Sequence, residues 1–529
     1  MEEFLTVEAL IIVLVLVATL VAIAVRRIRL PYTVALVLVG LFIAVRRPLD
    51  VEVTPELILS LFVPPLIFEA AFHLDLRLLR DTLPSILLLA VPGVLLTTLF
   101  VGGIVTLGTG LPFATAVVFG ALIAATDPVA VVALFRELGV PRRLAVAVEG
   151  ESLFNDGTAI VIFRIALVTA VSGFFDPLDG IFDFVQVALG GMAVGLALGW
   201  LAAQLIARVD DRLISTTLTT LLAYGAYLVA ERLHVSGVLA VVVAGLLTGN
   251  LGMAGVSPTT KSMIFDLWEY LAYIANSLVF LLIGLDIDVP QLWANLWPIA
   301  VAVAAVLVSR AAVVYGLSWL SSLGRDRARI PLRWRHVLFW GGLRGAISLA
   351  LALSLPVTLP DRDMLEAMAF GVVLFTLMGQ GTTIQFLLRR LGLIERPEHV
   401  IERERHVGRL LANHAGLREL ERLRRDGILT DQMWQGLRDD YIQAQSALTE
   451  EINQLFAEHA ELERALIIQV RREALEAEQA VLIDALRRGL LSDEVFNELR
   501  ADIDRRLEAM ALIETAVQSR RSPGAGEKK

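Results

Sequence analysis

The sequence contains no cysteine among its 529 residues. This absence excludes disulfide scaffolds, zinc–thiolate sites and cysteine nucleophiles. The motifs His-Glu-x-x-His and Gly-x-Ser-x-Gly are also missing, so metalloprotease and serine hydrolase chemistry have no support. No nucleic-acid partner and no cofactor are expected.

Charge is scarce in residues 1–393, whereas residues 394–529 are dense in arginine and glutamate. Hydrophobic residues make up 56% of the chain and the mean hydropathy is +0.69, values typical of proteins that span a membrane several times. We therefore predict an all-α membrane domain over 1–393, in contact with lipid, and a helical cytoplasmic tail over 394–529.

The apolar runs of the membrane domain predict thirteen spans, near 5–25, 30–45, 56–73, 83–108, 112–135, 142–172, 182–207, 214–231, 235–250, 262–285, 296–322, 334–356 and 364–391. If the tail is placed in the cytoplasm, the connections predicted to be cytoplasmic contain sixteen Arg and Lys residues, and those predicted to be outside contain four. Cytoplasmic connections are normally rich in Arg and Lys, so the asymmetry favours an N-terminus outside the cell. The acidic start, Met1-Glu2-Glu3, indicates a retained first span rather than a signal peptide.

Ionisable residues within spans mark candidate functional positions, because each is costly at membrane depth unless it is paired or hydrated. The richest segment is Gly150-Glu151-Ser152-Leu153-Phe154-Asn155-Asp156. Residues four apart share a helix face, so Ser152 lies with Asp156, and Glu151 with Asn155. A hydroxyl and a carboxylate on one face suit a hard cation such as sodium, while a buried polar network between helices is the alternative.

The stretch Ala125-Thr126-Asp127-Pro128 predicts a break in its span. Proline lacks an N–H and disfavours helical geometry at the preceding residue. Broken spans expose carbonyl groups and helix ends that bind ions in transporters, so the Thr126 carbonyl is a candidate ligand. Asp127 is expected beside the following half-helix; a simple proline kink with a capping aspartate is the alternative.

Arg344, within Gly341-Gly342-Leu343-Arg344-Gly345-Ala346, supplies a positive charge in another span, and we expect Glu151 and Asn155 as its partners. Its expected role is structural and electrostatic. Glu69 and His73, four residues apart in a third span, are expected either to line a cytosolic funnel or to form a polar contact at a helix end.

These motifs, with Pro64-Pro65-Leu66-Ile67-Phe68-Glu69-Ala70, resemble those of the cation/proton antiporter 1 family, which includes NhaP-type antiporters and eukaryotic sodium/proton exchangers. The resemblance covers 1–393 and follows the family's order. It implies thirteen spans with inverted repeats and broken helices, a six-helix core, a dimerisation domain, a homodimer and an inner-membrane location.

The resemblance also implies roles for individual residues. Asp156 matches the aspartate that binds sodium and proton alternately, with Ser152 and Thr126 as further sodium ligands. Asp127 matches the aspartate of the broken span and Glu151 a site carboxylate acting partly through water. Asn155 and Arg344 match a pair that braces the crossing helices, and Asn155-Asp156 resembles the pattern of electroneutral exchangers. Arg310 is left open between a family arginine and a lipid or loop contact.

The expected activity is therefore exchange of sodium, or lithium, for protons by alternating access, with the ion and the proton competing for Asp156. A potassium/proton exchanger on the same scaffold is the nearest alternative. An intramembrane aspartyl protease using Asp127 and Asp156 is another, but its Gly-x-Gly-Asp pattern is absent and Arg344 would have no role in it.

The tail contains two stretches that are similar at a spacing of 62 residues, within Arg424–Arg438 and Arg487–Arg500. Each predicts a helix that ends at a glycine, a short apolar turn, and a cap for the next helix at Thr430 or Ser492. We expect a duplicated helical hairpin and a disordered end at 522–529. A regulatory role and a merely solubilising one are both open.

Overall fold

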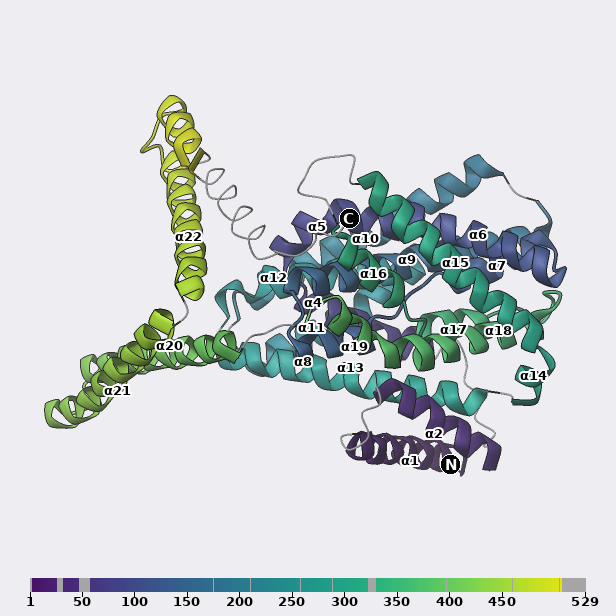
Figure 1. Ribbon diagram of the computed structural model, residues 1–529, viewed down its shortest axis with the longest axis horizontal. Helices are drawn as coiled ribbons and strands as arrows, with labels where there is room; N and C mark the ends of the chain where they lie inside the picture. Colours follow the sequence, from purple (N-terminus) through teal and green to yellow (C-terminus); the bar gives the residue numbers. More distant parts are fainter. Residues whose placement is uncertain are drawn as a thin grey trace, which may run out of the picture. The chain divides into compact units, whose positions relative to one another are not determined.

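The computed structural model describes residues 2–25, 32–46, 58–174, 176–209, 211–256, 258–287, 289–321, 330–394, 398–458, 460–503 and 505–506. All regular structure within these ranges is helical (Figure 1). The chain divides into two compact units, Met1–Glu395 and Arg396–Lys529. The predicted disordered end at 522–529 lies outside the described residues.

Helices of the first unit overlap every one of the thirteen predicted segments. Its first half contains α1 (Glu2–Val25), α2 (Tyr32–Arg46), a π-helical turn η1 (Ile58–Phe62), α4 (Val63–His73), α5 (Leu76–Ala90), α6 (Pro92–Thr109), α7 (Phe113–Leu122), α8 (Val129–Leu138) and α9 (Arg142–Ser172). Its second half contains α10 (Pro177–Ile206), α11 (Arg212–Arg232), α12 (Gly237–Asn250), a 3₁₀ turn η2 (Gly252–Gly255), α13 (Pro258–Asp286), α14 (Val289–Ala294), α15 (Leu296–Ser321), α16 (Leu332–Trp340), α17 (Ala346–Leu353), α18 (Arg362–Phe375), a π-helical turn η4 (Thr376–Gln380) and α19 (Gly381–Arg390).

Many of these helices are apolar enough for a membrane interior. In the part of the chain that the structure describes, seven are also long enough to cross one: Leu76–Thr109, Arg142–Ser172, Pro177–Ile206, Arg212–Arg232, Thr260–Asp286, Leu296–Leu320 and Arg362–Arg390. Five shorter apolar helices accompany them. Apolar side chains exposed on such helices are the expected surface against lipid. The prediction of an all-helical protein that crosses the membrane several times is confirmed.

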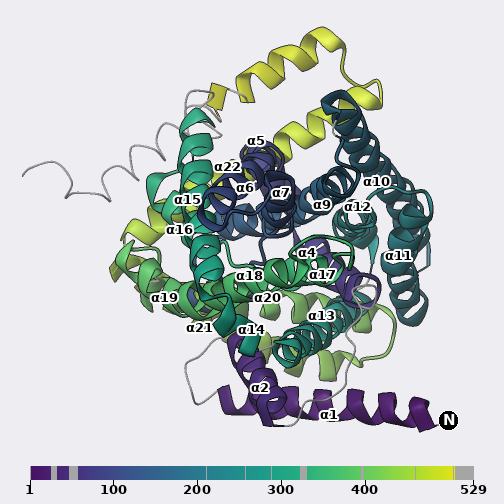
Figure 2. The same ribbon diagram turned by 90° about the vertical axis from the view of Figure 1, so that its right-hand side faces the viewer.

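Small residues allow the closest helix contacts. Helices α10, α11 and α12 are neighbours (Figure 2), and α10 lies against α12 at Gly191 and Gly195. A Cβ atom at Gly195 would overlap the carbonyl oxygen of Ala240. Close backbone approach of this kind stabilises helix pairs in lipid, where burial of apolar surface from water contributes little.

Two helical segments of the first unit are interrupted within their length. Residues 123–128 are non-helical between α7 and α8, and residues 341–345 separate α16 from α17. Pro128 explains the first interruption, as predicted from the sequence, and the second carries three glycines among its five residues. The two interruptions provide the backbone of the candidate site.

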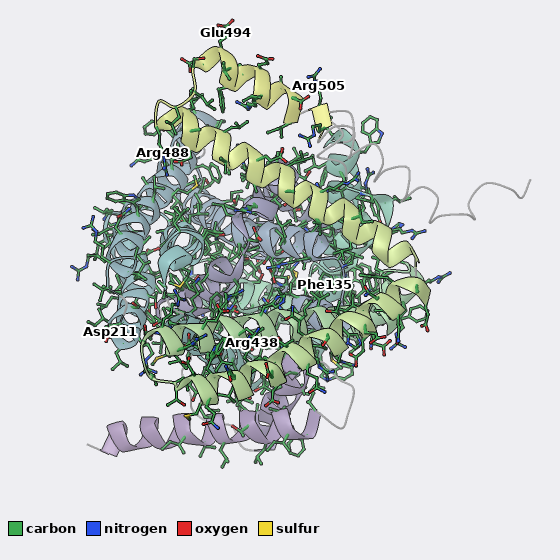
Figure 3. The ribbon with its side chains drawn as sticks, turned by 90° about the vertical axis from the view of Figure 1, so that its left-hand side faces the viewer. Phe135, Asp211, Arg438, Arg488, Glu494 and Arg505 are labelled. Carbon is green, nitrogen blue, oxygen red and sulfur yellow. The ribbon has the colours of Figure 1, made fainter. Side chains whose placement is uncertain are left out.

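The second unit consists of helical hairpins. Helix α20 (Glu398–Arg425) pairs with α21 (Asp431–Glu458), where the Nδ2 of Asn413 donates to the carbonyl of Tyr441 at 3.1 Å. Helix α22 (Ala460–Arg487) is followed by a helix over 493–503 that returns along it, as the labels Arg488, Glu494 and Arg505 in Figure 3 show.

The turns of the two hairpins have the same construction. Gly427 and Gly489 have φ values of +73° and +70°, which glycine adopts at little cost. Each is followed by a residue whose N–H donates back into the preceding helix, Ile428 to Leu423 and Leu490 to Ala485. The hydroxyls of Thr430 and Ser492 then accept hydrogen bonds from the N–H groups of residues 433 and 495.

This construction makes the two glycines testable. We expect Gly427→Ala and Gly489→Ala to destabilise their hairpins by about 1 kcal/mol each, because the left-handed conformation is unfavourable for alanine. Hydrogen exchange of the full-length protein, followed by mass spectrometry at the two turns, measures the change. Gly436→Ala is the control, since a Cβ there meets nothing within 4 Å in the helix interior, and it should slow exchange. Unchanged protection in both turn variants would contradict the assignment.

Candidate functional site

The two interruptions lie against each other and satisfy each other's backbone. The N–H of Asp127 donates to the carbonyl of Leu343 at 2.8 Å, so the α7–α8 interruption is joined directly to the α16–α17 interruption. Contact is close enough that a Cβ atom at Gly345 would overlap the carboxyl group of Asp127. A glycine is therefore required at this crossing, and this explains part of the glycine content around Arg344.

Helix α9 supports the first interruption through Thr126. The Oδ1 of Asn155 accepts from the N–H of Thr126 at 3.3 Å, and its Nδ2 donates to the Thr126 hydroxyl at 2.6 Å. The hydroxyl of Ser152 donates to the Thr126 carbonyl. Three polar groups of one broken segment are thus satisfied by two side chains one helical turn apart, which fixes the segment against α9.

Among the described residues, Arg344 forms no hydrogen bond or ion pair with Glu151 or Asn155, so its predicted pairing is wrong. Its guanidinium donates instead to the carbonyls of Ala124 and Ala125, at 2.5 and 2.9 Å, and the side chain is fully buried. The physical reason is the break itself. Ala124 and Ala125 directly follow the last turn of α7, so their carbonyls have no helical N–H partner, and a cation is the preferred group at the C-terminal end of a helix.

Glu151 is paired with Arg310 of α15. The two carboxylate oxygens accept from the guanidinium at 2.6 and 2.8 Å, and the same group donates to the carbonyl of Leu338 in α16 at 2.9 Å. Both side chains are buried. From the sequence alone, two roles for Arg310 stayed open: a match to a family arginine, and a contact with lipid or a loop. Its position as a lone charge in a long apolar run was the signal that it needs a buried carboxylate.

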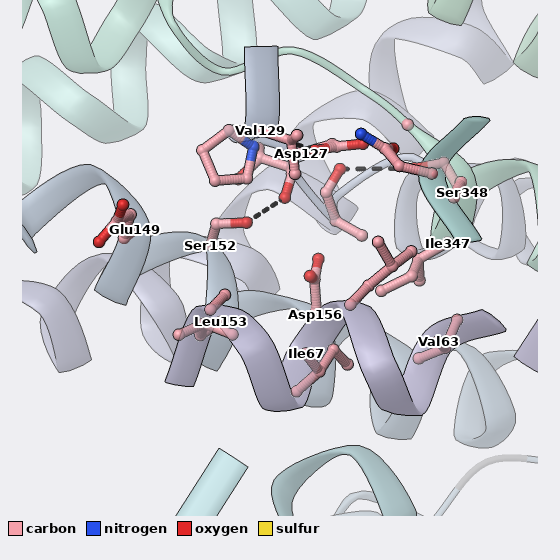
Figure 4. A pocket seen from close by; sticks show the side chains of 18 residues that line it. Val63, Ile67, Asp127, Val129, Glu149, Ser152, Leu153, Asp156, Ile347 and Ser348 are labelled. Atoms are coloured by element: carbon pink, nitrogen blue, oxygen red, sulfur yellow. Dashed lines mark hydrogen bonds between the residues drawn. The ribbon is translucent and has the colours of Figure 1, made fainter. Parts of the chain in front are cut away.

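A cavity of about 70 Å³ lies at the crossing (Figure 4). Its polar lining includes four of the five residues predicted as ion ligands: Thr126, Asp127, Ser152 and Asp156. The fifth, Glu151, does not line the cavity. Figure 4 shows the Asp156 carboxyl group directed into the space below Asp127 and Ser152. The volume is sufficient for a small number of water molecules or an ion with some of its water.

The carboxyl groups of this cavity differ in their hydrogen bonds. Asp127 accepts from the N–H of Val129 at 3.0 Å and so caps α8. Asp156 is 8% exposed and has no hydrogen-bond partner among the described residues. Burial of a carboxyl group without a protein partner is unfavourable, so Asp156 is the group with a free position for a ligand.

The opposite wall of the cavity is formed mainly by α4, through Val63, Leu66, Ile67 and Ala70. The sequence did not predict this wall. Its apolar character gives the cavity one polar side, at the crossing, and one side that excludes water.

Glu69 and His73 lie on α4 but outside the lining of the cavity. The Nδ1 of His73 is 2.8 Å from the carbonyl of Glu69 and 3.3 Å from its carboxylate. Glu149, which does line the cavity, is 3.3 Å from the guanidinium of Arg136. Glu69, His73 and Glu149 all interact electrostatically with Arg136. These four residues, two carboxyl groups, an imidazole and a guanidinium, are called the mouth cluster hereafter.

Comparison with known proteins identifies relatives of the whole first unit. A family model described as "Sodium/hydrogen exchanger, transmembrane" matches residues 12–390. The Na(+)/H(+) antiporter NhaS2 of Synechocystis sp. is 36% identical over 506 residues, which cover 94% of this chain and 93% of the relative. The Na(+)/H(+) antiporter ApNhaP of Aphanothece halophytica is 43% identical over 371 residues, covering 69% of this chain and 70% of the relative.

The fold also has a solved counterpart. The structure of the sodium proton antiporter MjNhaP1 from Methanocaldococcus jannaschii superimposes with a TM-score of 0.63 and 22% identity, covering 75% of this chain and 100% of that chain. The family resemblance predicted from the motifs is confirmed.

The Glu151–Arg310 pair generates a stability prediction. Arg310→Met leaves a buried carboxylate without its partner and should destabilise the protein by about 3–5 kcal/mol. The double variant Glu151→Met/Arg310→Met should recover most of this loss, because two apolar side chains replace both charges. Thermal unfolding of the purified protein in detergent measures both. A double variant as unstable as Arg310→Met alone would show that the pair is not the cause.

Proposed function

Because the chain belongs to the sodium/hydrogen exchanger family, we propose that it exchanges sodium ions for protons across the membrane at Asp156. The observation that carries this proposal is the unpartnered carboxyl group of Asp156 in a buried cavity between two crossing helix interruptions. A single carboxylate binds either a proton or a cation, and competition between the two couples their movement.

The sodium ligands in this proposal are oxygens of the crossing. They are the carboxylate of Asp156, the hydroxyl of Ser152 and the carbonyl of Thr126, with Asp127 adjacent. Carboxylate, hydroxyl and carbonyl oxygens are the ligands that hard cations prefer. The Ser152 hydroxyl donates to the Thr126 carbonyl in this conformation, and rotation of its O–H hydrogen away from that carbonyl frees lone pairs on both oxygens for an ion at Asp156.

Transport then proceeds by alternating access. The rigid part is the crossing, held by Asn155, Arg344 and the Glu151–Arg310 pair, and it moves against the apolar wall of α4. An ionised and empty Asp156 does not pass this wall, because an uncompensated charge there has a large desolvation cost. Only the site neutralised by sodium or a proton crosses, which prevents a leak of either ion.

The finer features of this proposal are thirteen spans with the N-terminus outside, a tail in the cytoplasm, an inner-membrane location and a homodimer. The distribution of Arg and Lys among the connections supports the orientation. The mouth cluster, with its three acidic or titratable partners around Arg136, is proposed to line the path from the cytosol to the cavity.

The decisive test replaces the shared carboxylate. Asp156→Asn should abolish proton movement driven by sodium, because an amide neither ionises nor neutralises a cation. Everted vesicles or proteoliposomes, with internal pH followed while sodium, lithium or potassium is added, provide the measurement. Asp179→Asn, at an exposed carboxylate near the start of α10, is the matched control and should keep wild-type activity.

Each outcome has a defined meaning. Potassium-driven movement equal to that with sodium would keep the mechanism and change the substrate to potassium. Full activity of Asp156→Asn would contradict the assignment of the site and the competition mechanism.

For the tail we propose a regulatory role. Removing residues 395–529 should leave sodium/proton exchange present but move its pH profile, because the hairpin unit is then absent from the cytoplasmic side. The pH dependence of exchange in vesicles, at matched amounts of protein, tests this. An unchanged rate and profile would reduce the tail to a solubilising extension.

A further inference from the structure

The cavity has a second polar side chain without a partner. Asn276 of α13 lines it, is 8% exposed, and forms no hydrogen bond within the described ranges. The other lining side chains with polar atoms at the crossing are engaged: Asp127 with Val129, Ser152 with Thr126, and Ser348 with the carbonyl of Ala125 at 3.4 Å. Asp156 and Asn276 are the two polar side chains there that remain without a partner.

The burial of Asn276 needs an explanation. An amide carries two donor hydrogens and an acceptor oxygen, and burying it unpaired is unfavourable. The neighbouring Ser277 is fully satisfied, since its hydroxyl contacts the carbonyl of Tyr273 at 2.5 Å and the hydroxyl of Tyr32 at 2.8 Å. The polar residues of this helix turn therefore divide between a packing contact at 277 and a free amide facing the cavity at 276.

Asn276 differs from the other polar groups in its location. Thr126, Ser152 and Asp156 belong to the crossing, whereas Asn276 comes from α13, which packs on α4 of the apolar wall. An oxygen at this position comes from a helix that carries neither interruption and is separate from α9. A hard cation requires several oxygen ligands, and amide oxygens are suitable ones.

We propose that Asn276 is a further ligand of the transported cation, and that its amide oxygen completes the coordination begun by Asp156, Ser152 and Thr126. This inference rests on the proposed sodium/proton exchange. In the conformation described here, α13 then contributes to the affinity for the cation through Asn276. Protons need no such ligand at Asn276, so the residue acts on sodium affinity more than on maximal rate.

The test compares Asn276→Leu with Ser277→Ala. Leucine has the same branching and the same number of side-chain heavy atoms as asparagine but no ligand oxygen, while Ser277→Ala alters the adjacent residue of the same helix, which does not line the cavity. We expect Asn276→Leu to raise the apparent KM for sodium about tenfold with a maximal rate close to wild type, the size expected for one lost contact to a charge. Ser277→Ala should keep the wild-type KM.

A second readout does not depend on transport. Sodium should raise the Tm of the purified wild-type protein, and Asn276→Leu should require about tenfold more sodium for the same rise. If Asn276→Leu does not fold, Asn276→Ser and Asn276→Ala replace it, and a lower KM for the serine variant, which retains an oxygen, supports the proposal. Equal KM values for these two variants would overturn it.

Asp156→Asn, measured in parallel, separates the two proposals. Wild-type sodium KM in Asn276→Leu together with an inactive Asp156→Asn would remove Asn276 from the site and leave the proposed function intact. An active Asp156→Asn would remove the proposed function, whatever the result at Asn276.

Discussion

The structure of the site depends on one constraint, which is that backbone polar groups inside a membrane must find partners within the protein. Two helices are interrupted here, and each interruption leaves N–H and carbonyl groups without helical partners. The crossing resolves this by a hydrogen bond between the backbones of Asp127 and Leu343, and by side chains that satisfy further groups, among them Asn155, Ser152 and Arg344. The polar residues that first suggest an ion site are therefore largely engaged in holding the break together.

This assignment of partners makes the remaining groups informative. When the groups that close the interruptions are set aside, together with Glu149, which is paired with Arg136, the polar lining of the cavity retains Asp156 and Asn276. A buried polar group without a partner has a cost that evolution can remove easily by substitution to an apolar residue, so its presence points to a ligand. The same reasoning separates Asp127, which caps α8, from Asp156, although both carboxylates line the same cavity.

The sequence predicted the helical segments and the interruption at Asp127 because these follow from local properties, namely apolar length and the chemistry of proline. The duplicated turns of the tail could be predicted for the same reason, since a glycine and a capping hydroxyl affect only the few residues around them. Which residues far apart in the sequence pair with one another could not be predicted. A buried arginine requires acceptors, but Arg344 had carbonyls of a broken helix available, and Glu151 had Arg310, which is 159 positions away along the chain. The apolar wall of α4 and the position of Asn276 at the cavity could not be predicted either, because facing a cavity is a property of packing and not of local sequence.

The formal charges around the crossing agree with the electroneutral pattern that the Asn155-Asp156 resemblance implies. Glu151 and Arg310 form a closed pair and contribute no net charge. Arg344 is the one further cation buried at the crossing within the described ranges, and Asp127 and Asp156 are the two further carboxylates. With all of these groups ionised, one negative charge has no counterpart. One monovalent cation, either a sodium ion or a proton, brings the site to neutrality, and a second would create a positive charge with the same desolvation cost. Asn155 lies beside Asp156 in the sequence, and a carboxylate at this position would need another cation for neutrality. The asparagine amide is neutral and forms hydrogen bonds with Thr126 instead. The neutral side chain at 155 thus serves the geometry of the break and the charge balance together, and both follow from the constraint that shapes the crossing.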